Sequence, residues 1–206
     1  MPVSTEAEFT ERLVFLHGFT QTHHHWHDLA FALGTRLGVD DLAFVDLPGH
    51  GLSTTDASGI EDGAATAARL GGPGTYVGYS MGGRVALLAA LARPDLVERL
   101  IVIGATAGLE DESARATRRA HDDERADRLE EVGVERFLDE WLAAPMFAGL
   151  PDDAAGLARR RRNTTLGLAH SLRTCGTGSQ PSIWGRLGAI AAPTLVLAGA
   201  DDAKFV

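Results

Sequence analysis

Short apolar runs that alternate with helical patterns are the main regularity along the chain. The runs occupy residues 13–16, 42–45, 76–78, 100–103 and 194–197. Helical patterns occupy residues 26–37, 61–70 and 81–92, and Trp26, Leu29, Leu33 and Leu37 in the first are spaced for one buried face. Apolar runs of this length are typical of strands covered on both faces. The alternation predicts right-handed βαβ units, and therefore an α/β fold with a mostly parallel sheet.

A charge-dense helical segment interrupts this alternation between residues 108 and 170. Its amphipathic face is marked by Leu129, Val132, Phe137, Leu138 and Trp141. We expect a helical lid over the carboxyl edge of the sheet. The predicted organisation is a core in two parts, residues 1–107 and 171–206, with the lid at residues 108–170 between them.

Composition narrows the class of protein. The 206 residues are 45% apolar and 23% charged, which fits one globular domain. A net charge of −9 argues against a nucleic-acid partner. The single cysteine, Cys175, excludes an internal disulfide and favours a reducing compartment. Residues 1–10 lack the pattern of a secretory signal, and no apolar stretch approaches the roughly 20 residues of a membrane helix. These features predict a soluble cytoplasmic protein with no membrane partner.

Residues 78–82, Gly-Tyr-Ser-Met-Gly, match the Gly-x-Ser-x-Gly nucleophile elbow between a strand and a helix. Such a turn projects the serine hydroxyl above the sheet, so Ser80 is the candidate catalytic residue. The N–H group of Met81 is one expected oxyanion donor, and that of Phe19, in the turn after the first strand, is the other. The alternative is that both segments are plain glycine turns.

The expected acid of a catalytic triad is Asp202, which follows the last apolar run and a glycine. Asp201 is the adjacent alternative. Elbow enzymes have the order serine, acid, histidine, yet all eight histidines precede Asp202. His50, in a turn near the site, is the only conceivable substitute base. We therefore expect a fragment that lacks its final strand, histidine and helix, and that is poorly soluble with little or no activity.

Two clusters of like residues favour a simpler interpretation. His23, His24, His25 and His27 stand near a helix start. Consecutive histidines should point in different directions, so we expect a solvated cluster and no metal site. The arginines at residues 159–162 are expected to form a solvated helix face, since four consecutive side chains cannot share one side.

Several motifs together resemble one family. They are residues 16–20, 46–51 and 78–84, Arg118 with Arg119, Trp141 with residues 145–147, and residues 202–205. From about residue 13 to 205 the chain resembles the 2-succinyl-6-hydroxy-2,4-cyclohexadiene-1-carboxylate synthases of menaquinone biosynthesis. These are lyases of the α/β-hydrolase fold. The resemblance implies that fold with its last strand and helix missing, a substrate with several carboxylates, and no metal or organic cofactor.

The resemblance also implies substrate-binding residues. The candidates are Arg84, Arg118, Arg119, Tyr79, Trp141 and His17, with residues 162 and 163 as a further contact. Arginine binds carboxylates through two parallel hydrogen bonds, which suits such a substrate. Each candidate has a structural alternative: a solvated arginine in the elbow helix, a surface salt bridge for the arginine pair, lid core for Trp141, and packing for Tyr79.

The implied reaction uses Ser80 as a base rather than as a nucleophile. A histidine–acid pair would raise its basicity, and it would remove a proton next to a substrate carboxylate of 2-succinyl-5-enolpyruvyl-6-hydroxy-3-cyclohexene-1-carboxylate. The oxyanion donors would take the developing charge, and pyruvate would leave. One alternative is a hydrolase of esters or C–C bonds in which Ser80 attacks a carbonyl. Another is a catalytically silent fragment or binding domain. The expected partner is a small polycarboxylate, and the expected state is a monomer or small homo-oligomer.

Overall fold

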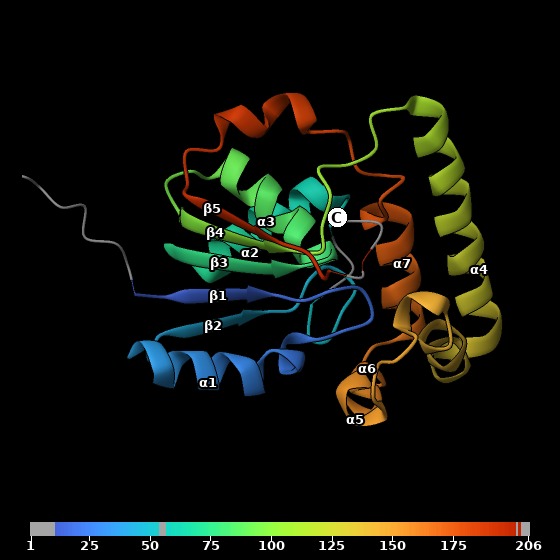
Figure 1. Cartoon of the computed structure of the whole chain (residues 1–206). Helices are drawn as coiled ribbons and strands as arrows, with labels where there is room; N and C mark the ends of the chain where they lie inside the picture. The colour runs from blue at the N-terminus through green and yellow to red at the C-terminus, as the bar shows by residue number, and fades with distance from the viewer. Residues whose placement is uncertain (1–10, 54–56, 201, 203–206) are drawn as a thin grey trace, which may run out of the picture.

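The computed structural model describes residues 11–53, 57–200 and 202. Its five strands form one sheet of order β2-β1-β3-β4-β5, and every pairing is parallel (Figure 1). The strands are β1 (Leu13–Leu16), β2 (Leu42–Val45), β3 (Gly74–Tyr79), β4 (Val97–Ile103) and β5 (Thr194–Leu197). All five predicted strands are confirmed, and β3 and β4 begin before their apolar runs. The predicted α/β fold with a parallel sheet is therefore correct.

The two faces of the sheet pack against different helices. Successive strand residues point to opposite faces. Val14 and Leu16 join a large core cluster with α2 (Ile60–Gly71) and α3 (Met81–Ala92). Phe15, between them, joins a smaller cluster with Trp26 and Ala30, beside α1 (His27–Leu37). The predicted helices therefore form, and they cover the sheet from both sides.

The predicted buried face of the first helix is wrong in part. Trp26 is buried, but Leu29 and Leu37 are 49% and 62% exposed. The residues of α1 that are buried are small, Ala30 and Gly34. A Cβ atom on Gly34 would lie 2.6 Å from the carbonyl oxygen of Val39, so the chain after the helix approaches it closely at this point. Backbone contact at a small residue, rather than leucine spacing, sets the packing.

A helical cap lies beyond the carboxyl ends of the strands, as predicted (Figure 1). It consists of α4 (Glu112–Leu142), the 3₁₀ turn η2 (Pro145–Phe147), α5 (Asp152–Ala155), α6 (Leu157–Arg160) and α7 (Thr165–Cys175). Apolar side chains of α4 and α7, among them Leu129, Phe137 and Leu168, form their own core. The backbone of α4 is broken at Gly133, whose φ of 77° leaves the helical region. Helix α7 continues past the predicted lid boundary at residue 170.

The chain returns from the cap to the sheet through the 3₁₀ helix η3 (Trp184–Ala189), which precedes β5. Across the described residues, no helix is both long enough and apolar enough to span a membrane.

Candidate functional site

Ser80 occupies a strained turn between β3 and α3. Its φ of 52° and ψ of −111° are unusual for a residue with a side chain. The turn is fixed by hydrogen bonds from the Ser80 N–H to the carbonyl of Ile103, at 2.9 Å, and from the Arg84 N–H to the carbonyl of Ser80, at 3.1 Å. Cβ atoms on Gly78 or Gly82 would collide with neighbouring backbone. Both positions of the motif therefore require glycine, because neighbouring backbone approaches them closely. The nucleophile-elbow interpretation expects this.

A cavity lies between this turn and the cap. The sheet side contributes Phe19, Ser80 and Met81, and the cap contributes Trp141 and Met146. Met81 is the first residue of α3, so its N–H has no acceptor within the helix. The positive end of the helix dipole also points toward this end of the cavity. The predicted oxyanion donors and the predicted serine thus line one cavity.

Arg84 lines the same cavity and is 7% exposed. Its guanidinium donates to Gln180 Oε1 at 2.9 Å and to the carbonyl of Cys175 at 2.8 Å. Burial lowers the pKa of Arg84 to about 10, so the group stays charged at neutral pH. Among the described residues, no carboxylate lies within ion-pairing distance of it. The cavity therefore holds a desolvated cation whose protein partners are neutral.

Two further arginines reach the cavity from α4. Arg118 Nε donates to Asp122 Oδ1 at 2.8 Å, and an Arg125 nitrogen lies 3.6 Å from the same oxygen. All three side chains line the cavity, and Asp122 is 1% exposed. With Arg84, the described residues that line the cavity include three cations and one anion. Arg125 was missed by sequence reasoning, although its position seven residues after Arg118 places both on one helix face.

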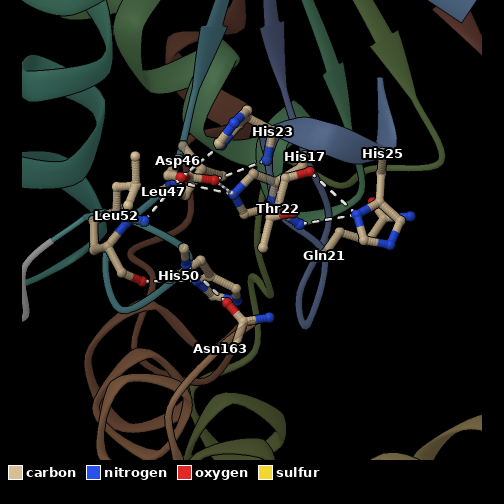
Figure 2. Close-up of polar contacts among 12 residues, drawn as sticks. His17, Gln21, Thr22, His23, His25, Asp46, Leu47, His50, Leu52 and Asn163 are labelled. Atoms are coloured by element: carbon tan, nitrogen blue, oxygen red, sulfur yellow. Dashed lines mark hydrogen bonds and ion pairs between the residues drawn. The ribbon is translucent and has the colours of Figure 1, made fainter. Parts of the chain in front are cut away.

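Three predicted substrate-binding residues do not line this cavity. Arg119 turns to the other side of α4 and donates to the carbonyl of Gly178 at 3.3 Å. The Tyr79 ring packs over Gly18, where an added Cβ would lie 2.9 Å from it. His17 is fully buried; its Nδ1 donates to the carbonyl of Gly18, and its Nε2 accepts from the N–H of Leu47 (Figure 2). These three residues therefore lie outside the lining of the cavity, and their role as substrate contacts stays a prediction.

Asp202 lies in the turn after β5, where its N–H donates to the carbonyl of Gly199 at 3.0 Å. Because β4 separates β5 from β3, the end of β5 lies about two strand spacings, roughly 10 Å, from the end of β3 that precedes Ser80. A bridging group would be needed between an acid there and the serine. The alternative acid, Asp201, lies outside the described residues.

No histidine of the described chain lines the Ser80 cavity. His50 is fully buried, its Nδ1 donates to the carbonyl of Pro48 at 2.9 Å, and its Nε2 accepts from the N–H of Thr20 at 3.2 Å. Burial lowers its pKa to about 3. Both ring nitrogens are engaged by backbone, so the prediction of His50 as a substitute base is wrong.

Residues of the cap hold the loop that carries Phe19. Thr20 has a φ of 64°, which is strained for a residue with a side chain. Asn163 donates to the carbonyl of Thr20 at 2.7 Å and accepts from the N–H of Gly51 at 2.9 Å. Arg160 donates to the Thr20 hydroxyl and to the carbonyl of Ala155. Arg160 is 4% exposed, so the expectation of a solvated arginine face is wrong at this residue, whereas Arg161 and Arg162 are exposed as expected. Asn163 is also 4% exposed, and its amide is engaged by backbone groups.

Comparisons with known proteins agree with this fold. Residues 13–205 match the model of the alpha/beta hydrolase family. A 2-succinyl-6-hydroxy-2,4-cyclohexadiene-1-carboxylate synthase of Escherichia coli O1:K1 / APEC is 35% identical, over 94% of this chain and 78% of the relative. A protein of the same name from Salmonella typhimurium is 35% identical, over 95% of this chain and 79% of the relative. The solved structure of MenH from S. aureus is 33% identical with a TM-score of 0.84, over 97% of this chain and 79% of that one.

Proposed function

We propose that this chain is a lyase of menaquinone biosynthesis. It belongs to the 2-succinyl-6-hydroxy-2,4-cyclohexadiene-1-carboxylate synthase family of α/β-hydrolases. Its substrate would be 2-succinyl-5-enolpyruvyl-6-hydroxy-3-cyclohexene-1-carboxylate, from which it would eliminate pyruvate. The products would be pyruvate and 2-succinyl-6-hydroxy-2,4-cyclohexadiene-1-carboxylate.

The observation that carries this proposal is the buried Arg84 guanidinium beside Ser80. A buried cation without an ionic partner is costly, and an anionic ligand offsets that cost. Arg118 and Arg125 add positive charge to the same cavity, and among the described residues that line it Asp122 is the one carboxylate. A neutral ester would gain little from these groups. A substrate with several carboxylates would gain orientation as well as charge compensation.

The proposed reaction assigns a role to each of these groups. Ser80 Oγ would take the proton from ring carbon 2, next to the carbon that carries the ring carboxylate. The electron pair of that C–H bond would form the 2,3 double bond, and the 3,4 double bond of the substrate would shift to positions 4 and 5. The C–O bond to the enolpyruvyl group would break, and the departing enolate would be protonated to pyruvate. The N–H groups of Phe19 and Met81 would stabilise the negative charge that develops on the substrate oxygen. Metal and organic cofactors have no part in this scheme.

Deprotonation of Ser80 needs an acceptor, and in the described chain no imidazole lines the cavity. Added imidazole should therefore act as that acceptor. We expect slow pyruvate release from the enolpyruvyl substrate, followed with lactate dehydrogenase and NADH, that rises with imidazole concentration. Ser80→Ala should lower the imidazole-dependent rate at least 100-fold, a typical contribution of general base catalysis.

A matched control is Ser171→Ala, which removes another hydroxyl from the same cavity. Its rate should stay within a few-fold of wild type. Pyruvate release that is unchanged in Ser80→Ala, or absent even with imidazole, would contradict the proposal. So would a covalent acyl group on Ser80, detected by mass spectrometry with a slow ester, because it indicates hydrolysis through a nucleophilic serine.

A further inference from the structure

Three histidines at the start of α1 converge on one point of the surface. One ring nitrogen from each of His23, His24 and His27 lies within 4.8 Å of those of the other two. His23 and His24 belong to the 3₁₀ turn η1 (His23–His25), and His27 opens α1. Residues four apart in helical backbone lie on the same face, which brings His27 back to His23. This arrangement corrects the expectation that these side chains diverge.

The fourth histidine of the cluster is held elsewhere. His25 Nδ1 is bound to the backbone of Thr22, at 3.1 Å from its nitrogen and 3.2 Å from its oxygen (Figure 2). Its Nε2 lies close to Gly156 of the cap. The convergence is therefore specific to three of the four rings, and His25 is not part of it.

A buried carboxylate fixes the orientation of one ring. Asp46 Oδ2 lies 2.7 Å from His23 Nδ1, and its Oδ1 accepts from the His23 N–H at 2.8 Å (Figure 2). The Asp46 side chain is 6% exposed and also accepts from the N–H of Leu52. Metal-binding histidines in proteins commonly donate their second ring N–H to such a carboxylate, which fixes the tautomer and raises the basicity of the other nitrogen. His23 Nε2 is then available as a ligand.

We propose that His23, His24 and His27 bind one divalent transition-metal ion of the Zn²⁺, Ni²⁺ and Cu²⁺ class. Three imidazoles without a carboxylate ligand suit these ions and not Mg²⁺ or Ca²⁺, which require oxygen ligands. Zinc–nitrogen bonds of about 2.0–2.1 Å place tetrahedral ligand nitrogens roughly 3.4 Å apart, so the ring nitrogens, which lie within 4.8 Å of one another, would need to approach by at most about 1.4 Å. All three are only half-buried, which leaves their side chains room to rotate. Water would complete the coordination.

Some neighbouring charges should weaken metal binding at this site, and others should strengthen it. Arg159 donates to the carbonyl of His24 at 2.9 Å, but its charge is paired with Asp28, also at 2.9 Å. Arg162 is exposed, and its positive charge acts on His24. Repulsion from Arg162 should weaken metal binding, whereas the negative charge of Asp46 should strengthen it. Removal of the Arg162 charge should therefore change the metal affinity of this site, whereas it should leave the affinity of a metal site elsewhere on the chain unchanged.

The test is calorimetric titration of the untagged chain with Zn²⁺. We expect one ion per chain, and an affinity at least tenfold lower in the double variant His24→Gln, His27→Gln. The matched control is His121→Gln, an exposed histidine on α4, which should leave the affinity unchanged. Arg162→Gln should raise the affinity several-fold. Mg²⁺ should not bind.

Thermal unfolding of the metal-free proteins shows whether each variant is folded. Zn²⁺ should raise the Tm of the wild type and of His121→Gln, but not that of the double variant, because a ligand stabilises only a state that binds it. The proposal is overturned if the folded double variant binds Zn²⁺ as tightly as the wild type, if the wild type binds none, or if His121→Gln loses binding equally. None of these histidines lines the Ser80 cavity, so the result is independent of the proposed function.

Discussion

Arg84 is the residue on which the chemistry of the cavity depends most directly. Its position in the first turn of α3, four residues after Ser80, ties the cation to the elbow through the hydrogen bond from its own N–H to the serine carbonyl. Gln180 and Cys175 hold the guanidinium in place without neutralising it. The group is therefore oriented before any ligand arrives, which lowers the entropic cost of binding.

Replacement of Arg84 by glutamine should weaken the use of a polycarboxylate substrate. Hydrogen bonds to charged groups contribute about 1.5–3 kcal/mol, which corresponds to a rise in KM of roughly 10- to 150-fold. The measurement is the KM of pyruvate release in the imidazole-supplemented assay. Arg36→Gln, which changes an exposed arginine of α1, is the control and should leave KM unaltered. Equal KM values for the two variants would show that Arg84 does not contact substrate.

At the level of elements, the cap does more than cover the cavity. Asn163 lies between α6 and α7, and it holds the loop after β1 and the turn after β2 at the same time. The loop after β1 carries Phe19, the expected oxyanion donor. The strained backbone of Thr20 persists because Asn163, Arg160 and His50 all bind it. The cap therefore helps to hold the loop after β1, which carries the expected oxyanion donor, in its strained conformation.

Two substitutions of Asn163 should separate its contact with the loop after β1 from its contact with the turn after β2. Asn163→Asp keeps an acceptor for the Gly51 N–H but loses the donor to the Thr20 carbonyl. Asn163→Ala loses both. We expect both variants to reduce the Ser80-dependent rate and to lose about 2 kcal/mol or more of unfolding free energy, because each leaves buried polar groups unpaired and the aspartate also buries a charge. Urea unfolding and the pyruvate assay measure the two effects. An aspartate variant with wild-type rate would argue against loop control.

The strand β5 presents an open, apolar edge. It is the last strand in the sheet order, and Leu195, Val196 and Leu197 are 51%, 68% and 43% exposed. Exposed apolar edge strands promote association with other chains. We expect Val196→Lys to reduce aggregation measured by light scattering. Leu52→Lys, at a residue 86% exposed outside the sheet, should change it much less. Equal effects would mean that general charge, rather than the edge, controls solubility.

How far the sequence could predict these features depended on the kind of signal. Buried parallel strands and the elbow have local patterns, and both were predicted correctly. The choice between Arg118 and Arg119 had no local signal, because neighbouring residues on a helix point in different directions and only the packing of α4 on α7 decides between them. Arg160 was misassigned for a similar reason. Its helix is four residues long, and its burial depends on a loop far away in sequence.

Over the whole molecule, two fully buried histidines link folding to pH. His17 and His50 each donate Nδ1–H to a backbone carbonyl and accept a backbone N–H at Nε2, so each ring is held neutral. Burial lowers their pKa values to about 4 and about 3. Their unfolded pKa is about 6.5, so the unfolded chain binds protons first as the pH falls. Their contribution to stability is present in full above pH 6.5 and decreases progressively below it.

At pH 5 each ring should have lost about 2 kcal/mol of its contribution, or about 4 kcal/mol for the pair, because the unfolded rings are protonated and the folded ones are not. Asp46, whose pKa is lowered, gives the same sign of dependence, but its contribution is lost only near and below pH 4. The measurement is the free energy of urea unfolding between pH 8 and pH 5. Substitution of the exposed His121 by glutamine should leave the slope unchanged. A flat profile over this interval would show that the buried rings accept protons in the folded chain as readily as in the unfolded one.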